Sequence, residues 1–128
     1  MPVKEAVLTA DAPAPLPVFS QAIKSNGMVY CSGQVGVDPK TGEMVQGTIQ
    51  DRTRQILKNM SAVLAAAGTS LDNVVKVNVF ITSMDNFGAV NEAYKEFFTS
   101  DPMPCRTCVA VYQLPRGTDV EIECTAAL

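Results

Sequence analysis

One long amphipathic segment, residues 48–68, restricts the folds open to this chain more than any other feature. Thr48 carries a side-chain oxygen that can cap the free amides of a first helical turn, and Asp51 lies where a capping box places its second member. Gly68 suits the left-handed residue that ends many helices. The residues of one face recur at helical spacing: Ile49, Thr53, Ile56, Met60, Val63, Leu64 and Ala67. The segment therefore predicts a helix with one buried face.

Short strand-like segments precede this helix. We expect an irregular lead-in over residues 1–17, because its last seven residues hold three prolines, which can neither continue a helix nor sit inside a sheet. Residues 28–32 have the composition of a short strand. Residues 35–37 and 44–45 flank an Asp-Pro-Lys-Thr-Gly run with turn-forming residues, so they predict a hairpin.

Alternating and helical patterns also follow the long helix. They predict a strand at residues 74–81, a helix at about 86–98, and strands at about 107–114 and 120–126. Ser83 or Asp85 is expected to cap the second helix, and its buried stripe is expected to contain Phe87, Val90, Tyr94 and Phe97. In the strand at 74–81, one face is expected to carry Val75, Val77, Val79 and Ile81.

The resulting order β-β-β-α-β-α-β-β predicts one α+β domain over residues 1–128, with a mixed six-stranded sheet and two helices on one face. If the Val and Ile faces of the strands meet the helices, the other face has a mixed composition. It then carries Lys76, Asn78, Phe80, Arg106, Cys108, Ala110, Tyr112, Glu121 and Glu123. Such a face is too apolar for bare solvent and too charged for a core, so it resembles a subunit interface that contains a polar site.

Charge and composition exclude several classes of function. The net charge is −3, with scattered Lys and Arg, which makes nucleic acid a poor candidate as the main partner. The chain has no histidine, so it has no imidazole base and no histidine-ligated metal site. No apolar run approaches the ~20 residues that span a bilayer, and the first residues lack a signal or transit pattern. We expect a cytoplasmic protein, with a mitochondrial or nuclear pool left open.

The four cysteines are Cys31, Cys105, Cys108 and Cys124. Cys105 and Cys108 have CxxC spacing, which alone is a weak metal or redox signal. Four-thiolate zinc sites usually contain a second close pair, and the other two cysteines stand far apart in the sequence. We therefore expect reduced, structural cysteines and no metal.

Several segments, spread from about Ala14 to Ala127, resemble the RidA/YjgF family, also called L-PSP proteins, and most of all its fungal members. The segments are Ser20-Gln21-Ala22, Ser32-Gly33-Gln34, Asp38-Pro39-Lys40-Thr41-Gly42-Glu43, Val75-Lys76-Val77-Asn78-Val79-Phe80, Arg106-Thr107-Cys108-Val109-Ala110-Val111, Leu114-Pro115 and Val120-Glu121-Ile122-Glu123. Each segment is weak alone, but together, in this order and spacing, they are highly specific.

The resemblance implies a chorismate-mutase-like fold, a homotrimer, and ligand clefts between adjacent subunits. It also implies a 2-iminobutanoate/2-iminopropanoate deaminase, which hydrolyses 2-imino or enamine acids of the 2-aminoacrylate class to 2-keto acids and ammonia without a cofactor. By the same resemblance, Arg106 would clamp the substrate carboxylate and Glu121 would hold the attacking water. Ser32 and Gly33 would form the pocket wall and supply backbone contacts, and Cys108 would supply further backbone contacts.

One position departs from the family pattern. Phe19 stands where the family usually has tyrosine before Ser-Gln-Ala, so its ring can still close the pocket but the hydroxyl is missing. We expect reduced turnover or a changed substrate preference if that hydroxyl assists the reaction. Two alternatives remain open from the sequence. One is an endoribonuclease or translation inhibitor, and the other is a non-catalytic trimer that binds small carboxylates or acts like a chaperone.

Overall fold

The long helix forms where its caps and apolar stripe predict it. In the computed structural model, which describes residues 3–128, helix α1 spans Ile49–Ala67. The Thr48 hydroxyl accepts a hydrogen bond from the Asp51 amide at 3.2 Å, and the Asp51 carboxylate accepts one from the Thr48 amide at 3.1 Å. Gly68 ends the helix with a φ of 93°, in the left-handed region that glycine tolerates best. The prediction for this helix is confirmed at both ends.

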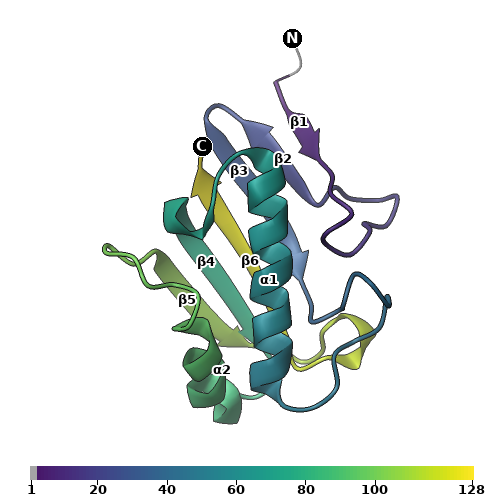
Figure 1. Cartoon of the computed structure of the whole chain (residues 1–128). Helices are drawn as coiled ribbons and strands as arrows, with labels where there is room; N and C mark the ends of the chain where they lie inside the picture. The colour runs from purple at the N-terminus through teal and green to yellow at the C-terminus, as the bar shows by residue number, and fades with distance from the viewer. Residues whose placement is uncertain (1–2) are drawn as a thin grey trace.

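The fold is α+β, with a mixed six-stranded sheet as expected. The strands are β1 (Glu5–Val7), β2 (Ala22–Ser25), β3 (Met28–Gln34), β4 (Val74–Ile81), β5 (Cys105–Ala110) and β6 (Val120–Ala127), and the second helix, α2, spans Phe87–Tyr94. The strand order across the sheet is β1-β2-β3-β6-β4-β5. Only β4 and β5 pair in parallel; the other neighbours are antiparallel. Figure 1 shows β1 and β5 at the two edges of this sheet.

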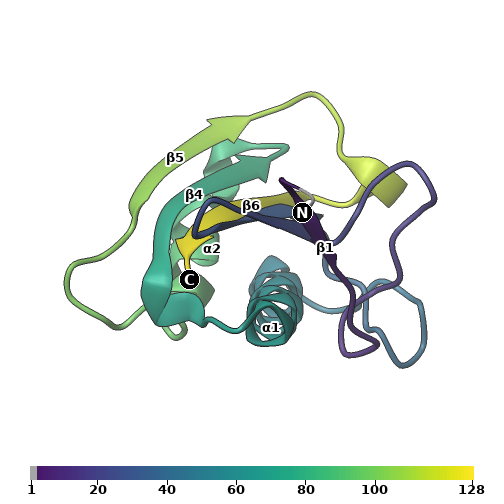
Figure 2. The same cartoon turned by 90° about the horizontal axis from the view of Figure 1, so that it is seen from above.

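Both helices lie on the same face of the sheet, as the alternation in the strands predicts (Figure 2). Between them and the sheet lies a continuous hydrophobic core, which includes Ile56, Leu57, Met60 and Leu64 of α1 together with Val29, Val77, Val79, Ile81, Ile122 and Ala126 of the strands. Each of the Val, Leu, Ile and Met side chains contributes on the order of 1.5–3 kcal/mol when fully buried. The opposite face of the sheet carries no helix among the described residues, and Tyr30 and Val109 are exposed there.

The strands before α1 differ from the prediction. Residues 35–45 were expected to form a hairpin, but they form only an isolated bridge between Val37 and Met44. Strand β2 instead pairs with β3 through the turn at Asn26 and Gly27, whose φ angles of 51° and 76° are typical of a two-residue hairpin. Strand β1 also contradicts an irregular lead-in over the whole of residues 1–17, of which residues 1 and 2 lie outside the described part.

The second helix is shorter than expected. A 3₁₀ turn at Met84–Asn86 precedes it, and the Ser83 hydroxyl caps that turn by accepting from the Asp85 amide at 3.2 Å. Helix α2 then ends at Tyr94 rather than at Phe98. The aromatic residues beyond it still pack on the core, because Phe98 is buried and its ring stacks on Tyr94 at 4.4 Å between centroids.

The predicted facing of Val75 is wrong, because a register shift lies beside it in the sheet. The pairing of β4 with β6 shifts between Val74 and Lys76, so that Val74 is buried and Val75 is 45% exposed. An extra residue of this kind reverses the inside-outside alternation on one side of it. Beyond the shift, Val77, Val79 and Ile81 face the core as expected.

Candidate functional site

A cavity of about 780 Å³ opens where β3 ends and β6 begins. The proline-rich loop before β2 forms one wall, and the loop after β5 forms another. The lining is mostly apolar, but it includes the polar side chains of Gln21, Ser32, Gln34, Arg116 and Glu121. A largely apolar hollow with a few converging polar groups is the usual form of a small-molecule site.

Glu121 is the acidic group of this cavity, and Gly33 lies directly against it. A side-chain carbon added to Gly33 would stand 2.9 Å from the carboxyl carbon of Glu121 and closer still to one carboxylate oxygen. Partial burial raises the pKa of Glu121, and the negative charge of Glu123 raises it further. Glu123 lies two residues along β6 and accepts a hydrogen bond from Asn78 at 3.0 Å. Glu121 therefore combines restricted solvation with increased basicity.

Ser32 and Gln21 fix the loop that walls the cavity. The Ser32 hydroxyl donates to the carbonyl of Ser20 at 2.6 Å, which makes Ser32 a structural tie rather than an activated nucleophile. Gln21 is buried, donates to the carbonyls of Thr9 and Pro13, and accepts from the Thr9 amide at 2.8 Å. These bonds hold the loop before β2 against the end of β3, where Ser32 and Gly33 lie.

Phe19 lines the same cavity and is 48% exposed. Arg116 lies on another side of the opening, and both terminal nitrogens of its guanidinium donate to the Gly42 carbonyl at 3.3 Å. The sequence did not single out Arg116, because an exposed arginine in a Pro-Arg-Gly turn has no distinguishing pattern.

Arg106 lies elsewhere, and its predicted facing is wrong. It pairs with Val77 on β4, and neighbouring residues on adjacent strands share a face, so its side chain lies on the helix side of the sheet. Its guanidinium carbon lies 4.8 Å from the ring centre of Tyr94 and 5.5 Å from that of Phe87, both on α2. Val109, which was expected to face the helices, is exposed on the opposite face instead.

A second, smaller hollow of about 340 Å³ surrounds Arg106. Its other lining residues are Asn91, Tyr94, Lys95, Met103 and Pro104. Within residues 3–128 the Arg106 guanidinium makes no ion pair, whereas Arg52 and Arg54 are paired with carboxylates at 2.8 and 3.0 Å. A half-buried guanidinium without a carboxylate partner can bind an external one.

Cys108 follows Arg106 by two residues on the same face, beside Val79, and packs against the core. Burial raises the pKa of its thiol, so it is protonated at neutral pH. Cys105 lies on the opposite face of β5. The structure brings together no group of three or more metal-ligating side chains within the described residues.

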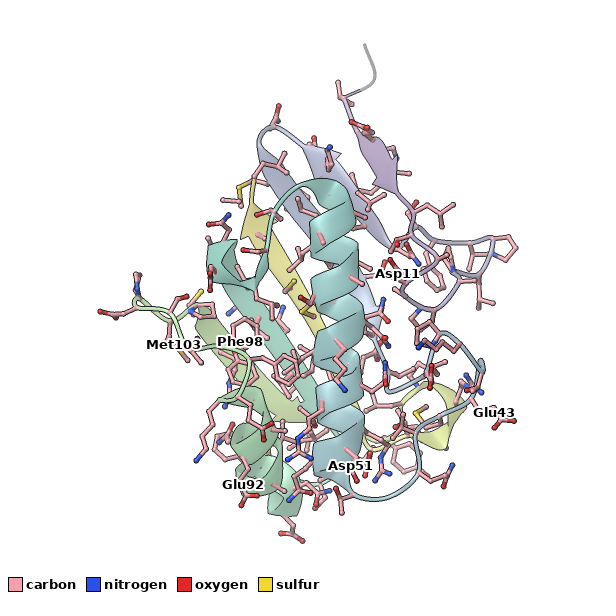
Figure 3. All side chains as sticks on the ribbon, viewed as in Figure 1. Asp11, Glu43, Asp51, Glu92, Phe98 and Met103 are labelled. Carbon is pink, nitrogen blue, oxygen red and sulfur yellow. The ribbon has the colours of Figure 1, made fainter. Side chains whose placement is uncertain are left out.

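The predicted site residues thus fall into two groups. Phe19, Ser32, Gly33 and Glu121 share the large cavity, which we call the water half, whereas Arg106 and Cys108 lie on β5, which we call the clamp half. Strand β4 separates β6 from β5, and the two halves face opposite sides of the sheet. In Figure 3, Met103 marks the side of the clamp half, and Glu43, next to the cavity-lining Gly42, lies across the molecule.

Comparison with known proteins agrees with the resemblance in the sequence motifs. Residues 9–128 match the family described as Endoribonuclease L-PSP. The 2-iminobutanoate/2-iminopropanoate deaminase of Mus musculus is 42% identical, over 97% of this chain and 91% of that protein. Protein mmf2, mitochondrial, of Schizosaccharomyces pombe is 45% identical, over 99% of this chain and 97% of that protein.

A solved structure extends the agreement to the fold. The crystal structure of a protein of the conserved Rid family from Yersinia pestis matches with a TM-score of 0.95 and 43% identity, over 98% of this chain and 99% of that one. Among the described residues, no helix is both long and apolar enough to cross a membrane. The near-complete coverage in sequence and structure shows that the chain belongs to the RidA/YjgF (L-PSP) family.

Proposed function

We propose that this protein hydrolyses 2-imino acids and their enamine forms, of the 2-aminoacrylate class, to 2-keto acids and ammonia. The observation that carries the proposal is the half-buried Arg106 guanidinium, which has no carboxylate partner within residues 3–128. Its planar fork matches a carboxylate with two parallel charge-assisted hydrogen bonds, which fix position and orientation together. The name of the mouse relative supports the same reaction.

The chemistry needs few further groups. Water adds to the C=N carbon, and Glu121 orients this water and accepts its proton, which its raised pKa favours. The C–N bond then breaks, the nitrogen takes up protons and leaves as ammonia, and the carbon becomes a keto carbon. No electrons are transferred, so no redox cofactor is required.

We infer that the two halves of one site come from different copies of the chain. Within one copy, the water half and the clamp half lie on opposite faces of the sheet and line separate hollows. We therefore propose a homotrimer in which Arg106 of one copy reaches the cavity of its neighbour, and we place the enzyme in the cytoplasm. The exposed apolar side chains on the open face of the sheet, Tyr30, Val75 and Val109, support burial between copies.

Mixing two inactive variants tests this arrangement. Arg106→Ala chains keep the water half, and Glu121→Gln chains keep the clamp half. After unfolding together and refolding as an equal mixture, about a quarter of the sites in a three-fold ring would combine two intact halves. We expect about a quarter of the wild-type rate of 2-iminobutanoate hydrolysis, measured with threonine dehydratase as the source of imine and semicarbazide as the trap.

Two results would contradict the proposal. A mixture as inactive as its two components, with mixed trimers present by native mass spectrometry, would mean that the halves do not meet between copies. Equal keto-acid release with and without the wild-type protein would show that the protein does not catalyse imine hydrolysis. Binding of 2-ketobutyrate in that case would favour the non-catalytic carboxylate-binding alternative. Cleavage of added RNA by the wild type but not by Arg106→Ala would favour the ribonuclease.

The pKa of Glu121 predicts the pH dependence. Because the base must be ionised, kcat/KM falls as the pH drops through its raised pKa. The charge of Glu123 contributes to that elevation, so Glu123→Gln should move the acid limb of the profile to lower pH. Glutamine can still accept the hydrogen bond from Asn78. The measurement is a pH profile of kcat/KM between about pH 4 and 8, using a fixed-ionic-strength buffer.

Glu5→Gln is the matched control, because Glu5 is an exposed carboxylate on the edge strand β1. Its acid limb should coincide with that of the wild type. An unshifted limb in Glu123→Gln would mean that Glu121 is not the group that titrates.

A further inference from the structure

We propose that Tyr94 is a positioning residue, whose ring face, together with that of Phe87, holds the Arg106 guanidinium in the orientation that receives a carboxylate. The inference rests on the proposed function for its consequence in catalysis, but the contact itself can be measured separately. The guanidinium carbon lies 4.8 Å from the centre of the Tyr94 ring and 5.5 Å from that of Phe87. Both distances lie within the ~6 Å range of a cation–π contact.

Contact through ring faces suits a residue that must remain free to bind. A guanidinium donates its hydrogen bonds from the edge of its plane, whereas a cation–π contact can use its face. An ion pair such as Arg52 with Asp119, where two nitrogens donate to both carboxylate oxygens at 2.9 and 2.8 Å, occupies the edge. Arg106 has no such partner within residues 3–128, so the aromatic contact fixes it without using the donors that a substrate needs.

The Tyr94 ring is itself held firmly. It is 6% exposed, and it stacks on Phe98 with an angle of 22° between the ring planes. Phe87 and Tyr94 are seven residues apart on α2, which places them two turns apart on one helix face. Phe98 therefore supports Tyr94, and Tyr94 supports Arg106. Phe87 is 38% exposed and is the second ring in contact with the guanidinium.

The ring of Tyr94, and not its hydroxyl, makes the contact with Arg106. Burial raises the pKa of Tyr94 to about 12, so the phenol stays neutral across the physiological range. No hydrogen bond of the hydroxyl is found within the described residues. Tyr94→Phe keeps the ring, the stack on Phe98 and the contact with Arg106, and it should behave as the wild type does.

Four variants test the proposal in the full-length protein. Tyr94→Leu and Phe87→Leu each remove an aromatic ring that contacts the Arg106 guanidinium. Tyr94→Phe keeps the ring. Phe97→Leu removes a partly buried ring of the same region, which makes no cation–π contact with Arg106 within the described residues. We expect Tyr94→Leu and Phe87→Leu to weaken 2-ketobutyrate binding about 3- to 10-fold, as loss of a partly desolvated cation–π contact implies. Binding by the other two should stay within about two-fold of the wild type.

Nuclear magnetic resonance of the Arg106 side chain gives a readout that a general loss of packing would not reproduce. The Nε–Hε signal, assigned by its absence in Arg106→Lys, should carry a ring-current shift in the wild type, in Tyr94→Phe and in Phe97→Leu. Tyr94→Leu and Phe87→Leu should each lose part of that shift. In the imine assay the same two variants should raise KM more than they lower kcat, because the clamp binds ground state and transition state alike.

The outcomes separate the two hypotheses. If no form of the protein, wild type included, binds 2-ketobutyrate or hydrolyses imine, the proposed function fails, and a retained ring-current shift would still show the aromatic contact. If Tyr94→Leu fails to fold, the test is the comparison of 2-ketobutyrate binding by Phe87→Leu, at the more exposed ring, with binding by Phe97→Leu. Equal effects of those two substitutions, or a loss in Tyr94→Phe as large as in Tyr94→Leu, would overturn the positioning role.

Discussion

Replacing Arg106 by alanine should lower kcat/KM for 2-iminobutanoate by about 100-fold or more, with little change in stability. Two charge-assisted hydrogen bonds to a carboxylate are worth about 1.5–3 kcal/mol each, so losing both removes roughly 3 kcal/mol or more of binding and orientation. A small substrate offers few other contacts to replace them. The coupled imine assay measures the rate. Thermal unfolding should show a loss of only about 1 kcal/mol, because Arg106 makes no ion pair within residues 3–128 and alanine removes only its contacts with the Tyr94 and Phe87 rings.

Arg106→Lys is the informative companion. Lysine keeps the positive charge but has no planar fork, so it should restore part of the affinity and little of the orientation. The expected order of kcat/KM is wild type, then lysine, then alanine. An alanine variant with at least half the wild-type kcat/KM would exclude Arg106 as the carboxylate clamp.

The second large effect is expected at Gly33. An alanine there would bring its side-chain carbon against the Glu121 carboxylate, which is the end of a flexible side chain and can move aside. The fold should therefore survive, since Gly33 is not among the residues with positive φ and alanine also restricts the unfolded chain. The displaced carboxylate can no longer hold the water, so kcat should fall by about 100-fold, the lower end of the range for a general base.

Gly88→Ala provides the matched control. Gly88 lies in α2, has open space around its missing side chain, and is not at positive φ. Alanine there should leave kcat unchanged and stabilise the helix by up to about 1 kcal/mol. The measurements are kcat from the imine assay and the free energy of unfolding from urea titration. Normal kcat in Gly33→Ala would show that Glu121 need not occupy its present position.

Local sequence signals predicted the parts of this fold that local forces decide. The caps and stripe of α1, the strand at 74–81 and the strand from Val120 follow from capping, alternation and burial, which act over a few residues. The Asn26-Gly27 turn is an equally local signal. Asparagine followed by glycine tolerates the two positive φ angles of a tight hairpin, and it would have indicated β2.

The pairing of β5 shows why the sheet face that carries Arg106 and Cys108 was predicted wrongly. Alternation separates Arg106 and Cys108 from Thr107 and Val109, but it does not say which set meets the helices. The valines suggested the wrong set, because β5 is an edge strand whose open face also carries apolar residues. The parallel register with β4 decides the matter, and that pairing joins residues about 30 positions apart. The residues of the water half lie together because they stand on the adjacent strands β3 and β6 and on the loop beside them.

The placement of the two halves on opposite sides of the chain has a consequence for assembly. A two-fold pair joins the same patch of each molecule, so one such contact cannot unite surfaces that point away from each other. If the two halves meet between copies, as proposed, completing every half requires head-to-tail contacts that close into a ring. In such a ring the number of finished sites equals the number of chains, and an unassembled chain has none. Dilution below the assembly constant would then switch off the reaction without altering the fold of any chain.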